Sequence, residues 1–143
     1  MAANALNLAK AQSIVSAALA HGRSLSLKPL TVAVLDAGGH LLAFAREDNS
    51  SNLRPQIATG KASGALALGV SSRKIGEMAI ERPTFINAAG LISQAGIIPA
   101  AGGVLIQDGD GVVVGAVGVT GDTSDNDELC AIAGIAAAGL TAA

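Results

Sequence analysis

The sequence predicts an α+β fold in which an antiparallel sheet, made of two β-hairpins, is flanked by helices. One hairpin lies in Ile98–Gly121, where two apolar runs are joined by Asp108-Gly109-Asp110-Gly111. An Asp-Gly turn between apolar runs is typical of a hairpin, since Gly109 and Gly111 tolerate the positive φ of tight turns. Two further apolar runs flank a turn at Gly38, and helical patterns separate and enclose the hairpins. The predicted element order is α-β-β-α-α-β-β-α.

The first helix is predicted over Leu6 to His21. Apolar residues at spacings of three and four form one face, made of Leu8, Ala11, Val15 and Ala18. Either Asn4 or Asn7 caps its start, and Gly22 stands where a C′ glycine ends a helix.

The first hairpin follows this helix. Leu30 to Leu35 is a continuous apolar run of strand length, which predicts a buried strand. Asp36-Ala37-Gly38-Gly39 is a turn, and His40 to Arg46 returns as the partner strand. The polar segment Glu47 to Arg54 predicts a loop.

Helices are predicted between the two hairpins. Pro55 suits a first helical turn, and either Ser71 or Ser72 caps a shorter helix that runs through Met78 and is ended by Arg82-Pro83. Thr84 to Gln94 is either a short helix or irregular, and the order of elements also leaves room for one extra short strand near Ile97. The apolar face of the helix after Pro55 is Ile57, Ala58, Ala62, Ala65, Leu66 and Gly69.

The last helix is predicted to start within Ser124–Glu128, where acidic residues complement the helix dipole. Its inward face is predicted to be Leu129, Ile132, Ala133, Ala136 and Leu140.

The composition favours one domain, residues 1–143, that associates with copies of itself. Half of the residues are apolar, only 14% are charged, and the only aromatic residues are Phe44 and Phe85. The core is therefore aliphatic, and a surface this poor in charge favours a homo-oligomer.

Charge and segment lengths exclude other classes. The net charge of −2 and the lack of a basic cluster argue against nucleic-acid binding. No apolar run reaches the roughly 20 residues that span a bilayer, and no signal-peptide pattern opens the chain, so we expect no membrane partner. Cys130 is the single cysteine, so no internal disulfide forms, and a cytoplasmic location is expected.

Five segments occur in a characteristic order: Val34–Arg46, Ile57–Ala62, Gly102–Ile106, Gly115–Gly121 and Asp127-Glu128. Together they resemble the GlcG/HbpS family, which includes the C-terminal domain of PduO-type proteins. The resemblance covers nearly the whole chain. It implies a profilin-like arrangement and a protein that binds or degrades haem.

The two histidines have both structural and functional interpretations. His21 ends the first helix, where it interacts favourably with the helix dipole. The family resemblance implies a second role for His21, as an axial metal ligand to haem iron and so a cofactor-binding residue. His40 follows the first hairpin turn and is interpreted as an exposed turn residue.

Cations and small residues suggest a binding site. Arg46 and Lys61 either form salt bridges, for Lys61 to Glu77 or Asp127, or hold a substrate carboxylate or haem propionates. Gly102 and Gly103 either shape the entry to the second hairpin or offer a bare backbone to a flat ligand. We add Thr120, at the end of the next strand, to the substrate-binding candidates.

Acids and the cysteine complete the candidates. Asp125, Asp127 and Glu128 either cap the last helix or, through Asp127 and Glu128, transfer protons together with Lys61 in a catalytic site. Cys130 is interpreted as a buried small residue, with a thiolate nucleophile as the lesser alternative.

Three functions follow. The first is a small-ligand or cofactor binding protein of the GlcG/HbpS type, whose ligand is haem or another tetrapyrrole. The second is a catabolic-pathway enzyme of isomerase, lyase or hydrolase type, in which Arg46 and Lys61 bind the carboxylate of a small substrate. The third is a structural or regulatory oligomer without a ligand.

Overall fold

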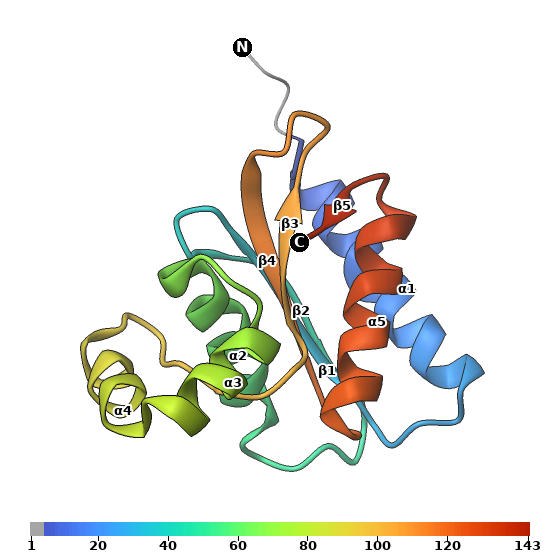
Figure 1. Ribbon diagram of the computed structural model, residues 1–143. Helices are drawn as coiled ribbons and strands as arrows, with labels where there is room; N and C mark the ends of the chain where they lie inside the picture. Colours follow the sequence, from blue (N-terminus) through green and yellow to red (C-terminus); the bar gives the residue numbers. More distant parts are fainter. Residues whose placement is uncertain (1–4) are drawn as a thin grey trace.

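A five-stranded sheet stands between two helical layers (Figure 1). The computed structural model describes residues 5–143. The strand order is β2-β1-β4-β3-β5, and every neighbouring pair is antiparallel. The predicted α+β class with two hairpins is confirmed. The strands are β1 (Thr31–Asp36), β2 (Leu41–Arg46), β3 (Gly103–Gln107), β4 (Val113–Thr120) and β5 (Thr141–Ala142).

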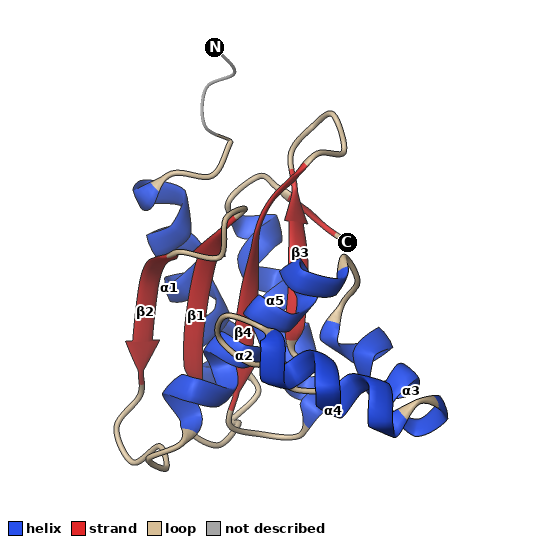
Figure 2. Ribbon diagram, turned by 90° about the vertical axis from the view of Figure 1, so that its left-hand side faces the viewer, coloured by secondary structure: helices blue, strands red, loops and turns tan. Residues whose placement is uncertain are grey.

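The helices divide between the two faces of the sheet. α1 and α5 pack together on one face, whereas α2 lies on the other face against β1, β4 and β3. α3 and α4 extend the α2 layer outward (Figure 2). The edge strand β2 packs against α1 rather than α2. The helix bounds are α1 (Leu8–Ser24), α2 (Arg54–Leu68), α3 (Ser72–Glu81), α4 (Pro83–Ile92) and α5 (Ser124–Ala137).

The core has two parts, one on each face of the sheet. The larger part joins α1 and α5 to the sheet and is aliphatic, as predicted. The smaller part lies under α2 and consists of Leu35, Ala62, Ala65, Leu105 and Ala116. Because β-strand side chains alternate between faces, Val32 and Val34 face α1 whereas Leu35 faces α2.

Local signals placed several helix ends correctly. The side chain of Asn7 caps α1 by accepting from the backbone N–H of Lys10 at 2.9 Å, while the alternative cap, Asn4, lies outside the described residues. Ser71 caps α3, and Pro55 stands in the first turn of α2. Pro83 begins α4, so the ambiguous segment is helical. Among residues 5–143 no strand forms near Ile97; the additional strand is β5, near the end of the chain.

Two predictions about glycines were wrong. Gly22 does not end α1, which runs on to Ser24; a Cβ at Gly22 would lie 2.5 Å from Leu30 Cδ1. Gly22 therefore packs closely against the Leu30 side chain and does not act as a helix cap. In the second hairpin turn only Gly111 adopts a positive φ, of 78°, and Gly109 does not.

The predicted inward face of the last helix was also wrong. Leu129 and Ile132 are 50% and 41% exposed, and α5 ends at Ala137, before Leu140. The face is set by the close approach of α1, because a Cβ at Gly134 would lie 2.7 Å from the carbonyl oxygen of Ile14. Small residues therefore face inward, and the buried ones are Cys130, Ala131, Gly134 and Ile135.

Candidate functional site

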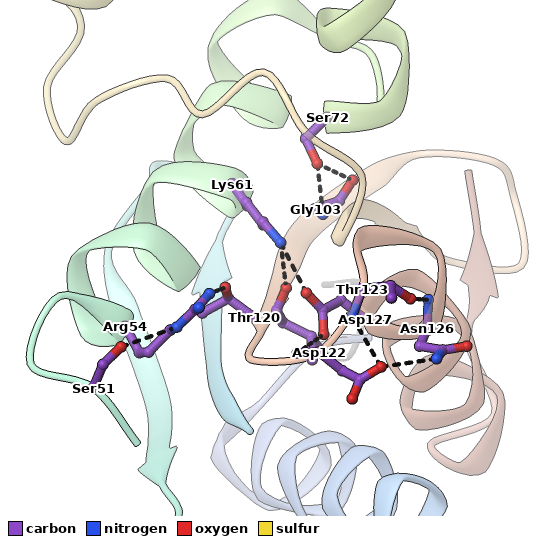
Figure 3. Close-up of polar contacts among 11 residues, drawn as sticks. Ser51, Arg54, Lys61, Ser72, Gly103, Thr120, Asp122, Thr123, Asn126 and Asp127 are labelled. Atoms are coloured by element: carbon purple, nitrogen blue, oxygen red, sulfur yellow. Dashed lines mark hydrogen bonds and ion pairs between the residues drawn. The ribbon is translucent and has the colours of Figure 1, made fainter. Parts of the chain in front are cut away.

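A buried ion pair joins the two helical layers beside the end of β4. The Lys61 ammonium, from α2, donates to Asp127 Oδ2 at 3.2 Å and to the carbonyl oxygen of Val119 at 2.9 Å (Figure 3). Asp127, from the first turn of α5, accepts a second hydrogen bond at Oδ1 from the backbone N–H of Asp122 at 3.0 Å. The side chains of the pair are 3% and 1% exposed. The predicted contact between Lys61 and Asp127 is confirmed.

Burial dominates the electrostatics of this pair. Desolvation lowers the pKa of Lys61, while attraction to Asp127 opposes that shift and the nearby charge of Arg54 adds to it. Desolvation likewise raises the pKa of Asp127, against the attraction of Lys61. Because neither side chain faces solvent, the geometry favours a clamp between layers over proton transfer to a ligand.

Glycines make room for the Lys61 side chain. Gly102 has φ of +127°, and a Cβ there would overlap the carbonyl oxygen of Val119 and lie 2.8 Å from Lys61 Nζ. A Cβ at Gly103 would overlap the backbone of Lys61, and the Gly103 N–H donates to Ser72 Oγ at 2.6 Å. Both glycines are buried. Close packing against α2 accounts for both glycines, and their assignment to substrate binding stays a prediction that this packing does not support.

Glu128 does not share a site with Asp127. Arg73 of α3 donates to Glu128 at 3.0 Å and also pairs with Asp125, on the surface of the molecule. The side-chain cap of α5 is Thr123, which accepts from the backbone N–H of Asn126 at 3.2 Å. The structure therefore separates the two acids proposed for catalysis into a buried pair and an exposed one.

Thr120 and Arg46 belong to one row across the sheet. Residue pairing places Thr31 of β1 opposite both Arg46 of β2 and Thr120 of β4. Thr120 Oγ1 accepts from Arg54 Nη1 at 2.6 Å, and Arg46 donates to the carbonyl oxygen of Ser50. Sequence reasoning treated Arg54 as a loop residue and missed Thr31 and Ser50. The pairing of β1 with β4 is the missing signal, and it joins segments far apart in the chain.

The histidines lie away from this region. His21 is half-buried in the last turn of α1, in the layer opposite α2. His40 is in the first hairpin turn, 3.1 Å from Asp36 Oδ1, and its side chain is exposed as predicted. Burial raises the pKa of Cys130 to about 11, which keeps its sulfur as the thiol rather than the thiolate.

Haem requires an axial ligand, apolar walls and cations for its propionates. His21 and Arg46 are the residues that the sequence offers for the first and last of these. The cavity that Arg46 lines, of about 510 Å³, is open and largely polar, with Arg23, Pro29, Glu47, Asp48 and Asn49 as its other residues. His21 is not in its lining. One chain by itself does not fit haem in a closed pocket at His21.

The described residues show neither a cluster of metal ligands nor a helix that could span a membrane. Within residues 5–143, no three His, Cys, Asp or Glu side chains gather in a way that suits a metal ion. None of the helices in that part of the chain combines the length and the apolar character needed to cross a bilayer.

This arrangement of sheet and helices defines an α+β domain with an antiparallel sheet between two helical layers. A family model described as "Haem degrading protein HbpS-like" matches residues 6–136. The chain belongs to this HbpS-like family, as the resemblance to GlcG and HbpS indicated. It is also similar to protein GlcG of Escherichia coli K12, with 36% identity over 114 residues that cover 76% of this chain and 79% of GlcG.

Two solved structures share the fold. The Klebsiella pneumoniae protein ORFY superimposes with a TM-score of 0.83 at 26% identity, covering 94% of this chain and 90% of ORFY. A PduOC:heme complex superimposes with a TM-score of 0.80 at 21% identity, covering 92% of this chain and 94% of that protein. The second likeness concerns the fold alone.

Proposed function

We propose that this chain is a small-ligand or cofactor binding protein, and that haem or another tetrapyrrole is its ligand. Membership of a family described as haem-degrading carries the proposal. The haem complex of a protein with the same fold supports it. In this proposal His21 supplies an imidazole to the iron, which when bound brings the spectroscopic and redox chemistry of the group.

The geometry adds one condition to this proposal. Because the residues of one chain do not close a pocket at His21, the ligand lies at a boundary between two copies of the chain. Exposed apolar side chains on α3 and α4 support a homo-oligomer, since Ile80, Leu91 and Ile92 are 84%, 88% and 89% exposed; these helices lie in the layer opposite His21, so the boundary at His21 is a separate surface. Sedimentation that shows only a monomer of about 14 kDa at micromolar concentration, with and without haem, would contradict this condition.

A haem titration of the His21→Ala variant tests the assignment. Loss of one axial ligand changes the spin state of the iron, so the variant is expected to lose a low-spin Soret and visible spectrum and to bind more weakly. His40→Ala is the matched control, because His40 is an exposed histidine paired only with Asp36 within the described chain. An unchanged spectrum in His21→Ala rejects His21 as ligand. A parent protein that does not bind haem rejects haem itself.

In the enzyme hypothesis, the structure leaves Arg46 but not Lys61 available to bind the carboxylate of a substrate. The buried Lys61 ammonium is engaged by Asp127 and Val119, whereas Arg46 is exposed and lies in the same row as Thr120. If the chain turns over a small carboxylated substrate, Arg46 is the predicted binding residue that the structure leaves accessible. Turnover that survives Arg46→Gln unchanged would remove this hypothesis.

A further inference from the structure

A row of polar side chains crosses three strands on the face that α2 covers. Thr31 lies directly opposite Arg46 and Thr120, and directly opposite residues of neighbouring strands point to the same face. Val32 and Ala45, one step along, pack into the core on the α1 side. Arg46, Thr31 and Thr120 therefore point toward the α2 side, where the hydrogen bond from Arg54 of α2 to Thr120 independently places Thr120.

The guanidinium groups of Arg46 and Arg54 lie at this row, and neither has an acidic partner among residues 5–143. Within residues 5–143 no acidic oxygen lies within 4.0 Å of Arg46 or Arg54, although Arg23, Lys61 and Arg73 all have acidic partners. The charge of Arg54 helps to lower the pKa of Lys61, so these two cations lie near each other. The charge of Lys61 is already balanced by Asp127. The region therefore carries two arginines without an ion-pair partner in the described chain, and Glu47 and Asp48 are the acidic residues that line the same cavity as Arg46.

The N-terminus of α2 adds to the positive potential. α2 begins at Arg54, and its N-cap residue, Leu53, makes no side-chain hydrogen bond to the first turn. In the first turn the N–H of Arg54 donates to the carbonyl oxygen of Ser51 and Pro55 has no N–H, so it is the helix dipole that favours an anion at this end. The 15-residue length of α2 gives it a full dipole.

Two buried hydroxyls beside these groups have no partner among residues 5–143. They are Thr31 Oγ1 and Ser50 Oγ, in residues that are 0% and 7% exposed. Thr31 is in the row itself. Ser50 is held beside the row, because Arg46 donates to its carbonyl oxygen. A buried hydroxyl without a hydrogen bond costs free energy, and an oxygen of a bound anion would accept from it.

We propose that Arg46, Arg54, Thr31 and Ser50 form a subsite for the carboxylate of the bound ligand. The guanidinium group of an arginine can donate to both oxygens of a carboxylate, and the hydroxyl groups of Thr31 and Ser50 donate to the same carboxylate. The proposal deepens the ligand-binding function proposed above and rests on it. It names the ligand class as a carboxylate, carried either by a small organic acid or by a propionate of a haem that binds between two copies of the chain, because His21 of the same copy lies in the helical layer on the other face of the sheet.

The open side of β2 provides an approach for the rest of such a ligand. Phe44 pairs with Ala33, and it precedes Arg46 by two residues in β2. The side chains of Phe44 and Arg46 therefore point to the same face of the sheet. Phe44 is 40% exposed, and α2 covers β1 and β4 rather than this edge strand. When the carboxylate of a ligand binds at the arginines, the apolar part of that ligand lies against the ring of Phe44. This arrangement suits an aromatic or otherwise flat acid.

The test compares Arg54→Gln and Thr31→Val with Arg73→Gln, an exposed arginine elsewhere. The probes are haem, haem dimethyl ester, benzoate and succinate, with Kd measured by Soret titration or calorimetry. Arg54→Gln is expected to weaken binding of the free acids about tenfold or more, because a charge-assisted hydrogen bond is lost. Thr31→Val is expected to weaken them less while keeping or raising the melting temperature, since it removes a buried hydroxyl without a partner. Arg73→Gln is expected to change neither.

The outcomes separate this proposal from the haem proposal. Weaker haem binding in Arg54→Gln with unchanged binding of the dimethyl ester supports a propionate in the subsite. Binding of benzoate or succinate that depends on Arg54, by a protein that does not bind haem, supports the subsite and removes haem. Haem binding that is equal in the parent, Arg54→Gln and Thr31→Val overturns the subsite and leaves haem standing. A parent that binds none of the four probes overturns both.

Discussion

Two sets of ion pairs connect the first turn of α5 to the α2 and α3 layer, and their surroundings differ completely. Asp127 meets Lys61 with side chains that are 1% and 3% exposed. Asp125 and Glu128 meet Arg73, whose side chain is 45% exposed. The same short segment therefore offers a buried pair and an exposed pair that join the same parts of the fold.

The difference teaches what each pair does. A buried pair gains little over apolar residues of the same shape, because removing two charges from water is costly. Once it is built, however, losing one partner leaves an uncompensated charge in the interior. Lys61 and Asp127 are also held by Val119 and Asp122, so their positions are fixed by hydrogen bonds on both sides. The exposed arginine has water as an alternative partner, and its contacts place few constraints on the fold.

Lys61→Ala is expected to have the largest effect on stability. It leaves the Asp127 carboxylate buried without its cation, and such a loss costs about 3–5 kcal/mol of unfolding free energy. Urea denaturation followed by circular dichroism measures it. Combining Lys61→Met with Asp127→Asn is the control, and the double variant is expected to be more stable than either single one. A loss below about 1 kcal/mol for Lys61→Ala would mean that water already reaches the pair.

The buried pair could be anticipated from the sequence, whereas its neighbours could not. A lysine among alanines on a helix needs a partner, and Asp127 was one of two acids considered for it. The hairpins were also predictable, because turn residues such as Gly39 and Gly111 act locally. The row through Thr31 and Thr120 depends on the pairing of strands far apart in sequence, which no local pattern contains.

The helical errors have a related origin. The sequence pattern predicts an inward face of α5 that includes the large residues Leu129 and Ile132, but the close approach of α1 at Gly134 favours small residues there. Arg82-Pro83 ends one helix, as the sequence predicts, but Pro83 also begins the next. Packing distances between elements decide these points, and a single sequence does not carry them.

Gly102→Ala is expected to have an intermediate effect by crowding the surroundings of the buried pair. The new methyl group would overlap the carbonyl oxygen of Val119 and lie 2.8 Å from Lys61 Nζ, and the φ of +127° is unfavourable for alanine. Overpacking of this kind costs about 1–3 kcal/mol. Gly109→Ala is the matched control in the second hairpin turn, because a Cβ there meets nothing within 4 Å and its φ is not positive. Equal stability of the two variants would show that the backbone at Gly102 shifts freely and that Lys61 does not depend on it.

Arg73→Ala is expected to have the smallest effect of the three. Its hydrogen bonds with Asp125 and Glu128 raise the pKa of the guanidinium, which is charged at every pH of interest with or without them. Water solvates all three groups when the arginine is removed, and salt screens the interaction while it is present. The midpoint of urea denaturation is therefore expected to stay near that of the parent, and 1 M NaCl is expected to remove what difference remains. A loss in Arg73→Ala as large as that in Lys61→Ala would show that the exposed contacts hold α5 in place, and burial would then no longer explain the contrast between the two pairs.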